Sequence, residues 1–293
     1  MTSHAVGLVG LGLVGQAVAQ RLRCAGMHVI GHDLRGEAVD AFRELGGEAA
    51  ASLAALGERV GTVLLAVFDT KGVLEVVEGE GGLLSGVPRV ERIVDCSTGS
   101  PEELEALWHR LRLRGIDFVE SPLSGSSQQI AAGEAVALVG AQEAAWEGAQ
   151  PLLSLIAAQC IHVGAPGMGA KAKLATNLVL GLNRAVFAEG LAFAESLGIA
   201  PQRFLELVQA TPARSDAAQV KGPLMVSGDF EPRSRIRQHQ KDVRLMLEAA
   251  QAKGLDLPFS RVHAALLAEA VDRGHGERDN AAIVLQLRGR KAK

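Results

Sequence analysis

A glycine-rich turn near the start of the chain constrains the fold more than any other feature. Gly10, Gly12 and Gly15 form a G-x-G-x-x-G motif. An apolar run before the motif predicts a strand, and the residues after it have helical spacing. A second predicted strand leads to Asp33, 18 residues after Gly15. This strand–turn–helix–strand context is the fingerprint of a dinucleotide-binding Rossmann unit.

Each glycine of the motif has its own physical role. Gly10 permits the tight turn, Gly12 lets backbone N–H groups approach a pyrophosphate, and Gly15 lets the helix pack closely on the strand. The helix N-terminus then favours anionic phosphates. The alternative is a tight turn that binds no ligand. The predicted cofactor-binding residues of this loop are Gly10, Leu11, Gly12, Leu13, Val14 and Gly15.

The acid after the second strand indicates which cofactor binds. The carboxylate of Asp33 is suited to ribose hydroxyls and repels a 2′-phosphate, so NAD is favoured over NADP. Arg35 leaves NADP open, because an arginine there is also suited to a 2′-phosphate. We predict that Asp33, Leu34 and Arg35 line the cofactor and that NAD is preferred.

The first half of the chain alternates short apolar runs with helical stretches. This alternation predicts βαβ units and a parallel sheet. The predicted strands are 6–9, 28–32, 60–67, 92–96, 117–120, 135–139 and 160–163, and the predicted helices are 14–25, 37–45, 101–114 and 143–157.

The pattern changes in the second half. A helical run covers 170–197, and an apolar residue recurs at every fourth position from Leu174 to Val186, as in a buried stripe. No convincing strand follows. The later predicted helices are 202–209, 216–226, 235–253, 260–273 and 280–287. We therefore predict an α/β Rossmann domain over 1–163 and an all-α domain over 164–293.

Composition excludes several classes of protein. The 293 residues include 30 basic and 33 acidic side chains, which is not the charge balance of a nucleic-acid-binding protein. Cys24, Cys96 and Cys160 show no CxxC or paired-histidine spacing, so we expect no disulfide framework, no metal site and a cytoplasmic location. We also expect no signal peptide and no membrane span.

A hydroxyl-rich loop follows the predicted strand 117–120. Its sequence, Ser-Pro-Leu-Ser-Gly-Ser-Ser from residue 121, offers hydroxyls and backbone N–H groups that suit a carboxylate. By itself, this sequence is equally typical of a polar surface loop that binds no ligand. The candidate substrate-binding residues in it are Ser124, Gly125 and Ser126.

Lys173 and Asn177 lie four residues apart near the start of the long helix, and therefore on one face. The helix dipole and partial burial are expected to lower the pKa of Lys173 toward a catalytic range. The alternative is a surface lysine beside a buried or capping asparagine. Lys171 is turned roughly 200° away around the helix and is expected to face elsewhere.

A basic stretch over 233–242 includes Arg233, Arg235, Arg237 and Lys241. This stretch is typical either of a solvated helix face or of the lining of an anion-binding site. Only a subset of these side chains can reach a single ligand, because they cannot all share one helical face.

Taken in order, these four motifs resemble those of the β-hydroxyacid dehydrogenase family, which includes 3-hydroxyisobutyrate dehydrogenases and tartronate semialdehyde reductases. The resemblance covers nearly the whole chain and extends to Asp95-Cys-Ser97-Thr98 and Lys241-Asp242. It implies a Rossmann domain and a 6-phosphogluconate dehydrogenase-like all-α domain joined by a long helix. It also implies a homodimer or homotetramer built through the C-terminal half.

The resemblance gives each motif a role. Lys173 would be the catalytic lysine, and Asn177 would help to place the substrate. Ser124 and Gly125 would hold the substrate carboxylate, and Lys241 would lie at the same cleft. The further residues that the resemblance places beside the cofactor are Val67, Phe68, Ser97, Thr98 and Lys241.

Four residues near the expected substrate depart from the family pattern, and all four are polar. They are Ser126 for a glycine, Thr176 for an asparagine, Ser234 for a phenylalanine and Gln238 for a leucine. They favour a more hydroxylated or more anionic acid, such as a four-carbon sugar acid, over 3-hydroxyisobutyrate. The candidate contacts for the extra groups are Arg235, Arg237 and His239.

We therefore expect reversible hydride transfer between NAD and a small anionic 3-hydroxy acid, with Lys173 taking the hydroxyl proton. The alternatives are an NADPH-dependent reductase of an aldehyde acid such as tartronate semialdehyde, a non-catalytic NAD-binding sensor, and an imine reductase of similar architecture. Lys173 with Asn177 argues against the sensor. Lys173 also argues against the imine reductase, because those enzymes replace this lysine.

Overall fold

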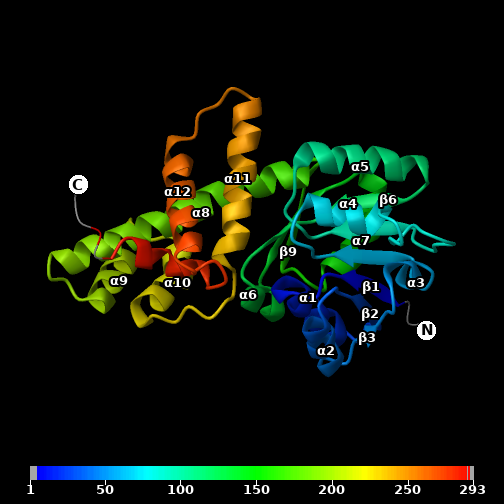
Figure 1. Ribbon diagram of the computed structural model, residues 1–293, viewed down its shortest axis with the longest axis horizontal. Coiled ribbons are helices and arrows are strands. Elements are labelled where there is room, and N and C mark those ends of the chain that lie inside the picture. Colours follow the sequence, from blue (N-terminus) through cyan, green and yellow to red (C-terminus); the bar gives the residue numbers. More distant parts are fainter. Residues whose placement is uncertain (1–4, 289, 291–293) are drawn as a thin grey trace. The chain divides into compact units, whose positions relative to one another are not determined.

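The computed structural model describes residues 5–288 and residue 290. The chain divides into two compact units, Met1–Lys173 and Leu174–Lys293, and each is described by itself. The two units are the α/β part and the all-α part of the predicted fold (Figure 1).

The first unit alternates strands and helices, as its sequence predicts. Its strands are β1 (Val6–Val9), β2 (Val29–His32), β3 (Glu48–Ala49), β4 (Thr62–Leu65), β5 (Arg92–Asp95), β6 (Asp117–Glu120), β7 (Leu123–Ser124), β8 (Val136–Gly140) and β9 (Gln159–Gly164). Its helices are α1 (Leu13–Cys24), α2 (Gly36–Glu44), α3 (Leu53–Gly57), α4 (Thr70–Glu78), α5 (Pro101–Leu113), α6 (Ser127–Ala132) and α7 (Glu143–Leu153). The short elements β3, α3, β7 and α6, and the longer helix α4, were not predicted.

The sheet has the strand order β3-β2-β1-β4-β5-β6-β8-β7, with β9 beside β8. The strands from β3 to β6 are parallel, which confirms the Rossmann arrangement. The sheet departs from the parallel arrangement at β8, which runs antiparallel to both β6 and β7. The short α6 packs on α1 instead of crossing over the sheet, so the chain re-enters the sheet in the opposite direction.

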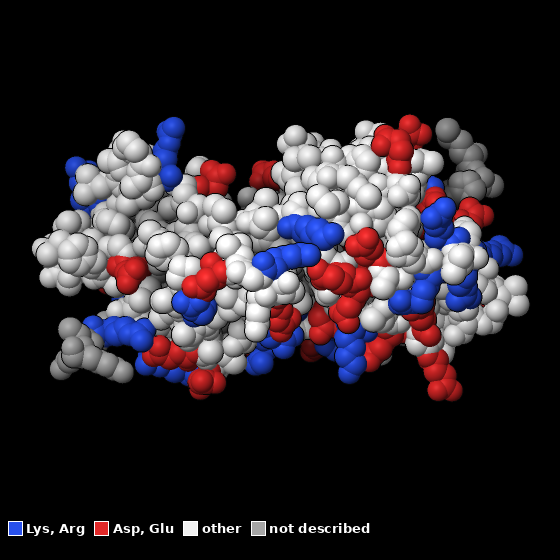
Figure 2. All heavy atoms as spheres, turned by 90° about the horizontal axis from the view of Figure 1, so that it is seen from above, with Lys and Arg blue, Asp and Glu red and all other residues white. Residues whose placement is uncertain are grey.

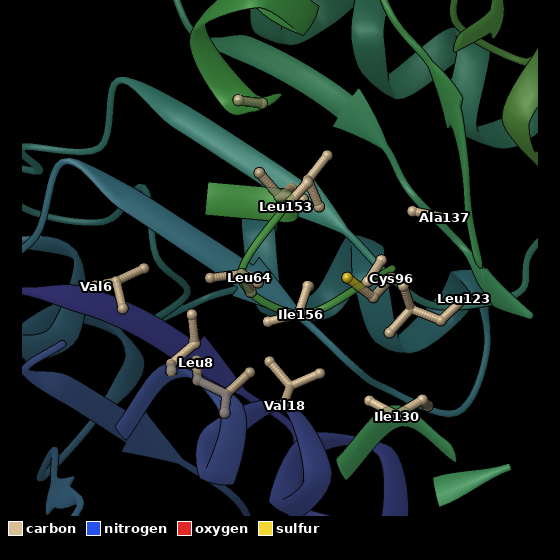
Figure 3. Packing of buried hydrophobic residues seen from close by; sticks show 14 of the residues in the cluster. Val6, Leu8, Val18, Leu64, Cys96, Leu123, Ile130, Ala137, Leu153 and Ile156 are labelled. Atoms are coloured by element: carbon tan, nitrogen blue, oxygen red, sulfur yellow. The ribbon is translucent and has the colours of Figure 1, made fainter. Parts of the chain in front are cut away.

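Two hydrophobic clusters cover the two faces of this sheet. Along β1, Val6 and Leu8 belong to one cluster and Val9 to the other, because successive side chains point to opposite faces. Figure 3 shows the first cluster, in which Leu8 lies beside Val18 of α1. Helices α1, α2 and α7 cover this face, and α3, α4 and α5 cover the other (Figure 1).

Helix α8 (Met168–Ser196) crosses the division between the units and continues into the all-α unit. The later helices are α9 (Pro201–Ala210), α10 (Asp216–Ser227), α11 (Ile236–Ala252), α12 (Pro258–Asp272) and the 3₁₀ helix η1 (Asn280–Gln286). No strand follows β9 among the described residues, as predicted.

The predicted buried stripe of α8 was wrong at its far end. Leu174 is buried, but Val186 is 66% exposed. Residues four apart on a helix advance by 400°, so a strict four-residue repeat drifts by about 40° at each step. The buried apolar residues of α8 in the core of the all-α unit include Leu174, Phe187, Ala188 and Leu191, and the half-buried Leu178 packs against them.

Asp279 organises the start of η1 and the loop before α11. Its carboxylate accepts hydrogen bonds from Lys221 Nζ at 2.8 Å and from the backbone N–H groups of Arg233, Ser234 and Ala281. It is fully buried, so these contacts replace the water that a carboxylate otherwise requires.

Basic and acidic side chains are interspersed on the face shown in Figure 2, where the described residues form no extended surface of one charge. Within the described ranges, no helix is long and apolar enough to cross a membrane. No group of metal-ligating side chains suited to an ion occurs among those same residues.

Candidate active site

The glycine turn between β1 and α1 has the geometry that its sequence predicts. Gly10 has φ of +88°, and a Cβ there would collide with the carbonyl oxygen of Ala66. A Cβ on Gly15 would collide with the carbonyl oxygen of Gly10. Both positions therefore require glycine for backbone packing alone.

Gly12 differs from the other two glycines, because little protein lies against it. A Cβ there would meet only the Arg35 guanidinium, at 3.4 Å. Gly12 is the N-cap of α1, which has no side-chain cap and no acid in its first turn within the described residues. The first N–H groups of the helix thus point to a position suited to a pyrophosphate.

Asp33 and Arg35 form one polar cluster beside this turn. Asp33 accepts hydrogen bonds from the backbone N–H of Leu11 at 2.7 Å and from Arg35 Nε and Nη2 at 3.1 Å. Burial raises the pKa of the Asp33 carboxyl, but these hydrogen bonds and the Arg35 charge outweigh it and leave the pKa below its ordinary value. Leu34, which separates them, is 95% exposed.

The other predicted cofactor residues follow β4 and β5. Val67 donates its backbone N–H to the Ser97 hydroxyl at 3.0 Å, which joins the two strand ends. Phe68 is 48% exposed, whereas Thr98 is buried. Because β1, β2, β4 and β5 are parallel, all these residues lie along one edge of the sheet, at the point where strand order reverses.

The hydroxyl-rich loop forms β7 and the turn into α6. Ser124 is half-buried, and Gly125 is exposed with φ of +145°. Ser126 stabilises the start of α6, because its hydroxyl accepts from the Gln129 N–H and its own N–H donates to the Gln129 side chain. This capping box occupies Ser126, so Ser124 and Gly125 are the groups left to face a ligand.

Lys173 lies against this loop. Its ammonium donates a hydrogen bond to the Leu123 carbonyl at 2.7 Å, and only 6% of the residue is exposed. Lys171, on another side of α8, is exposed and lies 3.8 Å from a carboxylate oxygen of Glu105. The two lysines therefore face apart, as their spacing predicts.

Glu120, which belongs to none of the sequence motifs, fixes the start of α8. Its carboxylate accepts hydrogen bonds from the backbone N–H groups of Gly167 and Ala170. Burial raises the pKa of the Glu120 carboxyl to about 7 against these hydrogen bonds. The sequence signal that could have identified Glu120 is an acidic residue at the end of a predicted strand. Its hydrogen-bond partners lie some 50 residues away in the sequence.

Asn177 begins a second polar cluster, within the all-α unit. It donates a hydrogen bond through its side-chain Nδ2 to Asp242 at 3.2 Å, and the other oxygen of Asp242 lies 3.0 Å from Lys241 Nζ. All three residues are at least nine-tenths buried. Asp242 thus orients the Asn177 amide and pairs with the Lys241 ammonium.

The basic stretch before and within α11 divides between surface and interior. Arg235 and Arg237 both pair with Glu277, and Arg233 pairs with Asp229. His239 is buried, and its ring lies 5.1 Å from that of His263. Of the three suggested contacts for extra substrate groups, His239 is the one that points inward.

Comparisons with known proteins agree with this geometry. A family model described as the NAD binding domain of 6-phosphogluconate dehydrogenase matches residues 5–164. A second, described as NAD-binding of NADP-dependent 3-hydroxyisobutyrate dehydrogenase, matches residues 167–287.

Two curated relatives match along nearly their whole length. The chain is 30% identical to L-threonate dehydrogenase of Cupriavidus necator, over 96% of this chain and 95% of that protein. It is 32% identical to 2-(hydroxymethyl)glutarate dehydrogenase of Eubacterium barkeri, over 95% of this chain and 93% of that protein.

Solved structures match as well. The 3-hydroxyisobutyrate dehydrogenase of Salmonella typhimurium superposes with a TM-score of 0.86 at 25% identity, over 96% of this chain and 99% of that one. Psf3 in complex with NADP⁺ and 2-OPP superposes with a TM-score of 0.88 at 25% identity, over 96% of this chain and 99% of that one.

The fold and its matches define an NAD(P)-dependent oxidoreductase that acts on hydroxy acids. Within that class, the chain belongs to the β-hydroxyacid dehydrogenase family.

Proposed function

We propose that the protein reversibly oxidises a small anionic 3-hydroxy acid with NAD, and that Lys173 is its general acid–base. The observation that carries this proposal is the buried Lys173 ammonium, which the Leu123 carbonyl holds beside Ser124 and Gly125. One turn further along α8, Asn177 offers a second polar group on the same helix face.

Each of these residues has a separate part in the proposed reaction. Ser124 and Gly125 bind the substrate carboxylate, and the reacting hydroxyl lies between Lys173 and Asn177. Lys173, once deprotonated, takes the hydroxyl proton, and in the reverse direction its ammonium protonates the carbonyl oxygen. Acid–base help of this kind contributes about 10²–10⁴-fold to the rate. When bound, NAD would supply the hydride-accepting chemistry, while the protein's residues hold the substrate and exchange the proton.

The cofactor preference rests on Asp33, whose ionised carboxyl beside the glycine turn favours ribose hydroxyls over a 2′-phosphate. The second candidate function is an NADP-dependent reductase of an aldehyde acid. Arg35 favours it, because its guanidinium also borders Gly12. That one solved relative holds NADP⁺ points the same way.

The proposed substrate is a polar hydroxy acid. Ser234 accepts a hydrogen bond from the Asn280 side chain at 2.9 Å, so this position holds a polar pair where the family pattern has a phenylalanine. The names of the two curated relatives, for L-threonate and 2-(hydroxymethyl)glutarate, also belong to polyhydroxy or dicarboxylic acids.

We also propose that the protein is a homo-oligomer that associates through α8. Val179, Val186 and Phe193 recur every seven residues on this helix and are 57%, 66% and 64% exposed. Such a stripe of exposed apolar side chains is suited to a second copy of the chain.

The test is an absorbance assay at 340 nm with a panel of hydroxy acids and both cofactors. The panel contains 3-hydroxyisobutyrate, L-threonate, glycerate and 2-(hydroxymethyl)glutarate. We expect oxidation of at least one acid, with higher kcat/KM for NAD than for NADP. Absence of turnover with every pair would contradict the proposed function, and a preference for NADP would favour the second candidate.

A further inference from the structure

Arg184 lies deep in the all-α unit, on the face of α8 that carries Asn177. Seven residues separate them, which brings Arg184 to within about 20° of the same direction two turns along. The residue is only 6% exposed. Its Nε and Nη1 atoms are buried and donate no hydrogen bond to any residue that the structure describes.

The two carboxylates near Arg184 accept no hydrogen bond from its Nε or Nη1. Asp279 is saturated by Lys221 and three backbone N–H groups. Asp242 accepts a hydrogen bond from Asn177 through Oδ2, and its Oδ1 lies 3.0 Å from Lys241 Nζ but accepts no hydrogen bond among the described residues. Both carboxylates favour the charged form of Arg184, although burial lowers its pKa to about 10, so the guanidinium remains charged at neutral pH.

The interior around Arg184 therefore holds an excess of positive charge. Among the described residues after Lys173, the buried charged side chains are Arg184, Lys221, Lys241, Asp242 and Asp279, three cations against two carboxylates. Burial lowers the pKa of His263 to about 4, so this neighbour is neutral and adds no charge. An uncompensated buried cation is costly, and a bound anion would relieve the cost.

The surroundings of Arg184 connect it to Asn177. Gly181 lies one turn before Arg184, and a Cβ there would meet the rings of His239 and His263. Side chains on a helix lean toward its N-terminus, so Arg184 extends toward Gly181 and Asn177. The imidazoles of His239 on α11 and His263 on α12 thus pack against the face of α8 that carries Asn177 and Arg184.

We propose that Arg184 binds a second carboxylate of the substrate, so that the preferred substrates are hydroxy acids with two carboxylates. The planar guanidinium matches a carboxylate with two parallel N–H donors, and one excess charge fits one carboxylate. This inference rests on the proposed function, because Asn177 holds the reacting end of the same molecule.

The test compares 2-(hydroxymethyl)glutarate with 2-(hydroxymethyl)pentanoate, in which a methyl group replaces the distal carboxylate. The wild type should favour the dicarboxylate in kcat/KM. Arg184→Gln should lower kcat/KM for the dicarboxylate by roughly 10²-fold and change the value for the pentanoate by less than about threefold. Arg184→Lys, which keeps the charge, should restore part of the difference and controls for folding. Equal losses on both acids, or no preference in the wild type, would overturn the proposal.

A binding measurement separates this proposal from the proposed function. Glutarate and pentanoate carry no reacting hydroxyl, so their effect on Tm in the presence of NADH does not depend on turnover. Glutarate should raise Tm more than pentanoate in the wild type, and the difference should vanish in Arg184→Gln. Equal shifts in both proteins would refute a carboxylate site at Arg184, whatever the activity assay shows.

Discussion

Asp33 and Arg35 carry opposite charges beside the same glycine turn, so single substitutions separate their effects on cofactor choice. Asp33→Ala removes the acceptor for ribose hydroxyls and the repulsion of a 2′-phosphate. We expect the ratio of kcat/KM for NAD to that for NADP to fall by about tenfold or more, equivalent to about 1.4 kcal/mol. Steady-state kinetics with both cofactors measures this ratio.

Arg35→Ala is the matched control for this prediction. It leaves the Asp33 carboxylate and its bond to Leu11 in place, so the preference for NAD should persist or increase. An unchanged ratio in Asp33→Ala would show that the carboxylate does not select the cofactor.

At the scale of the element, Glu120 couples the start of α8 to pH. The ordinary pKa of the carboxyl is 4.5, and burial raises it to about 7 in the folded protein. The folded state therefore holds the proton between these values. The contribution of Glu120 to the free energy of unfolding is therefore complete below pH 4.5. It is lost as pH rises through 7, and the loss amounts to up to about 3 kcal/mol.

Glu120→Gln should remove this dependence. On going from pH 5 to pH 8, the wild type should lose about 2–3 kcal/mol more of its free energy of unfolding than the variant loses. Urea unfolding at both pH values measures the difference. If the two proteins change in parallel with pH, the buried acid is not protonated on folding.

The elements also show what local sequence can and cannot predict. The glycine turn and the strands flanking it were predictable, because Gly10 and Gly15 are required by contacts formed within one strand–turn–helix unit. The Glu120 contact with α8 and the Asn177–Asp242 bond span 50 and 65 residues, and no local pattern encodes such partners.

Arg184 and Val186 show the same limit on one helix. From its residue type alone, Arg184 would be expected on the surface of the protein. The apolar Val186, two positions later, would be expected in the core. The structure reverses them, with Arg184 buried and Val186 exposed, because the tertiary packing of α11 and α12 decides which face is covered. The local geometry of the Rossmann edge was therefore easier to predict than the packing of the all-α unit.

At the scale of the whole molecule, the exposed stripe of α8 predicts association of two or more copies. Replacing both Val186 and Phe193 by glutamate places two charges in the apolar contact, so the variant should elute as a monomer while the wild type does not. Light scattering coupled to size exclusion measures the mass of each. Phe259→Glu is the matched control, since Phe259 on α12 is 76% exposed and lies outside the stripe.

A monomeric wild type at micromolar concentration would contradict association through α8. Loss of assembly in Phe259→Glu, with an intact oligomer in the α8 variant, would place the interface elsewhere.

In the proposed reaction, Lys173 exchanges the proton of the reacting hydroxyl. The most direct measurement of this role is kcat of Lys173→Ala on the best acid of the panel, beside Lys171→Ala and with the NADH affinity of each variant determined by fluorescence. Lys173→Ala should lose about 10²–10⁴-fold in kcat with unchanged NADH affinity, and Lys171→Ala should stay close to the wild type. If Lys173→Ala keeps most of its activity, or if Lys171→Ala loses as much, the assignment of the acid–base to Lys173 is wrong.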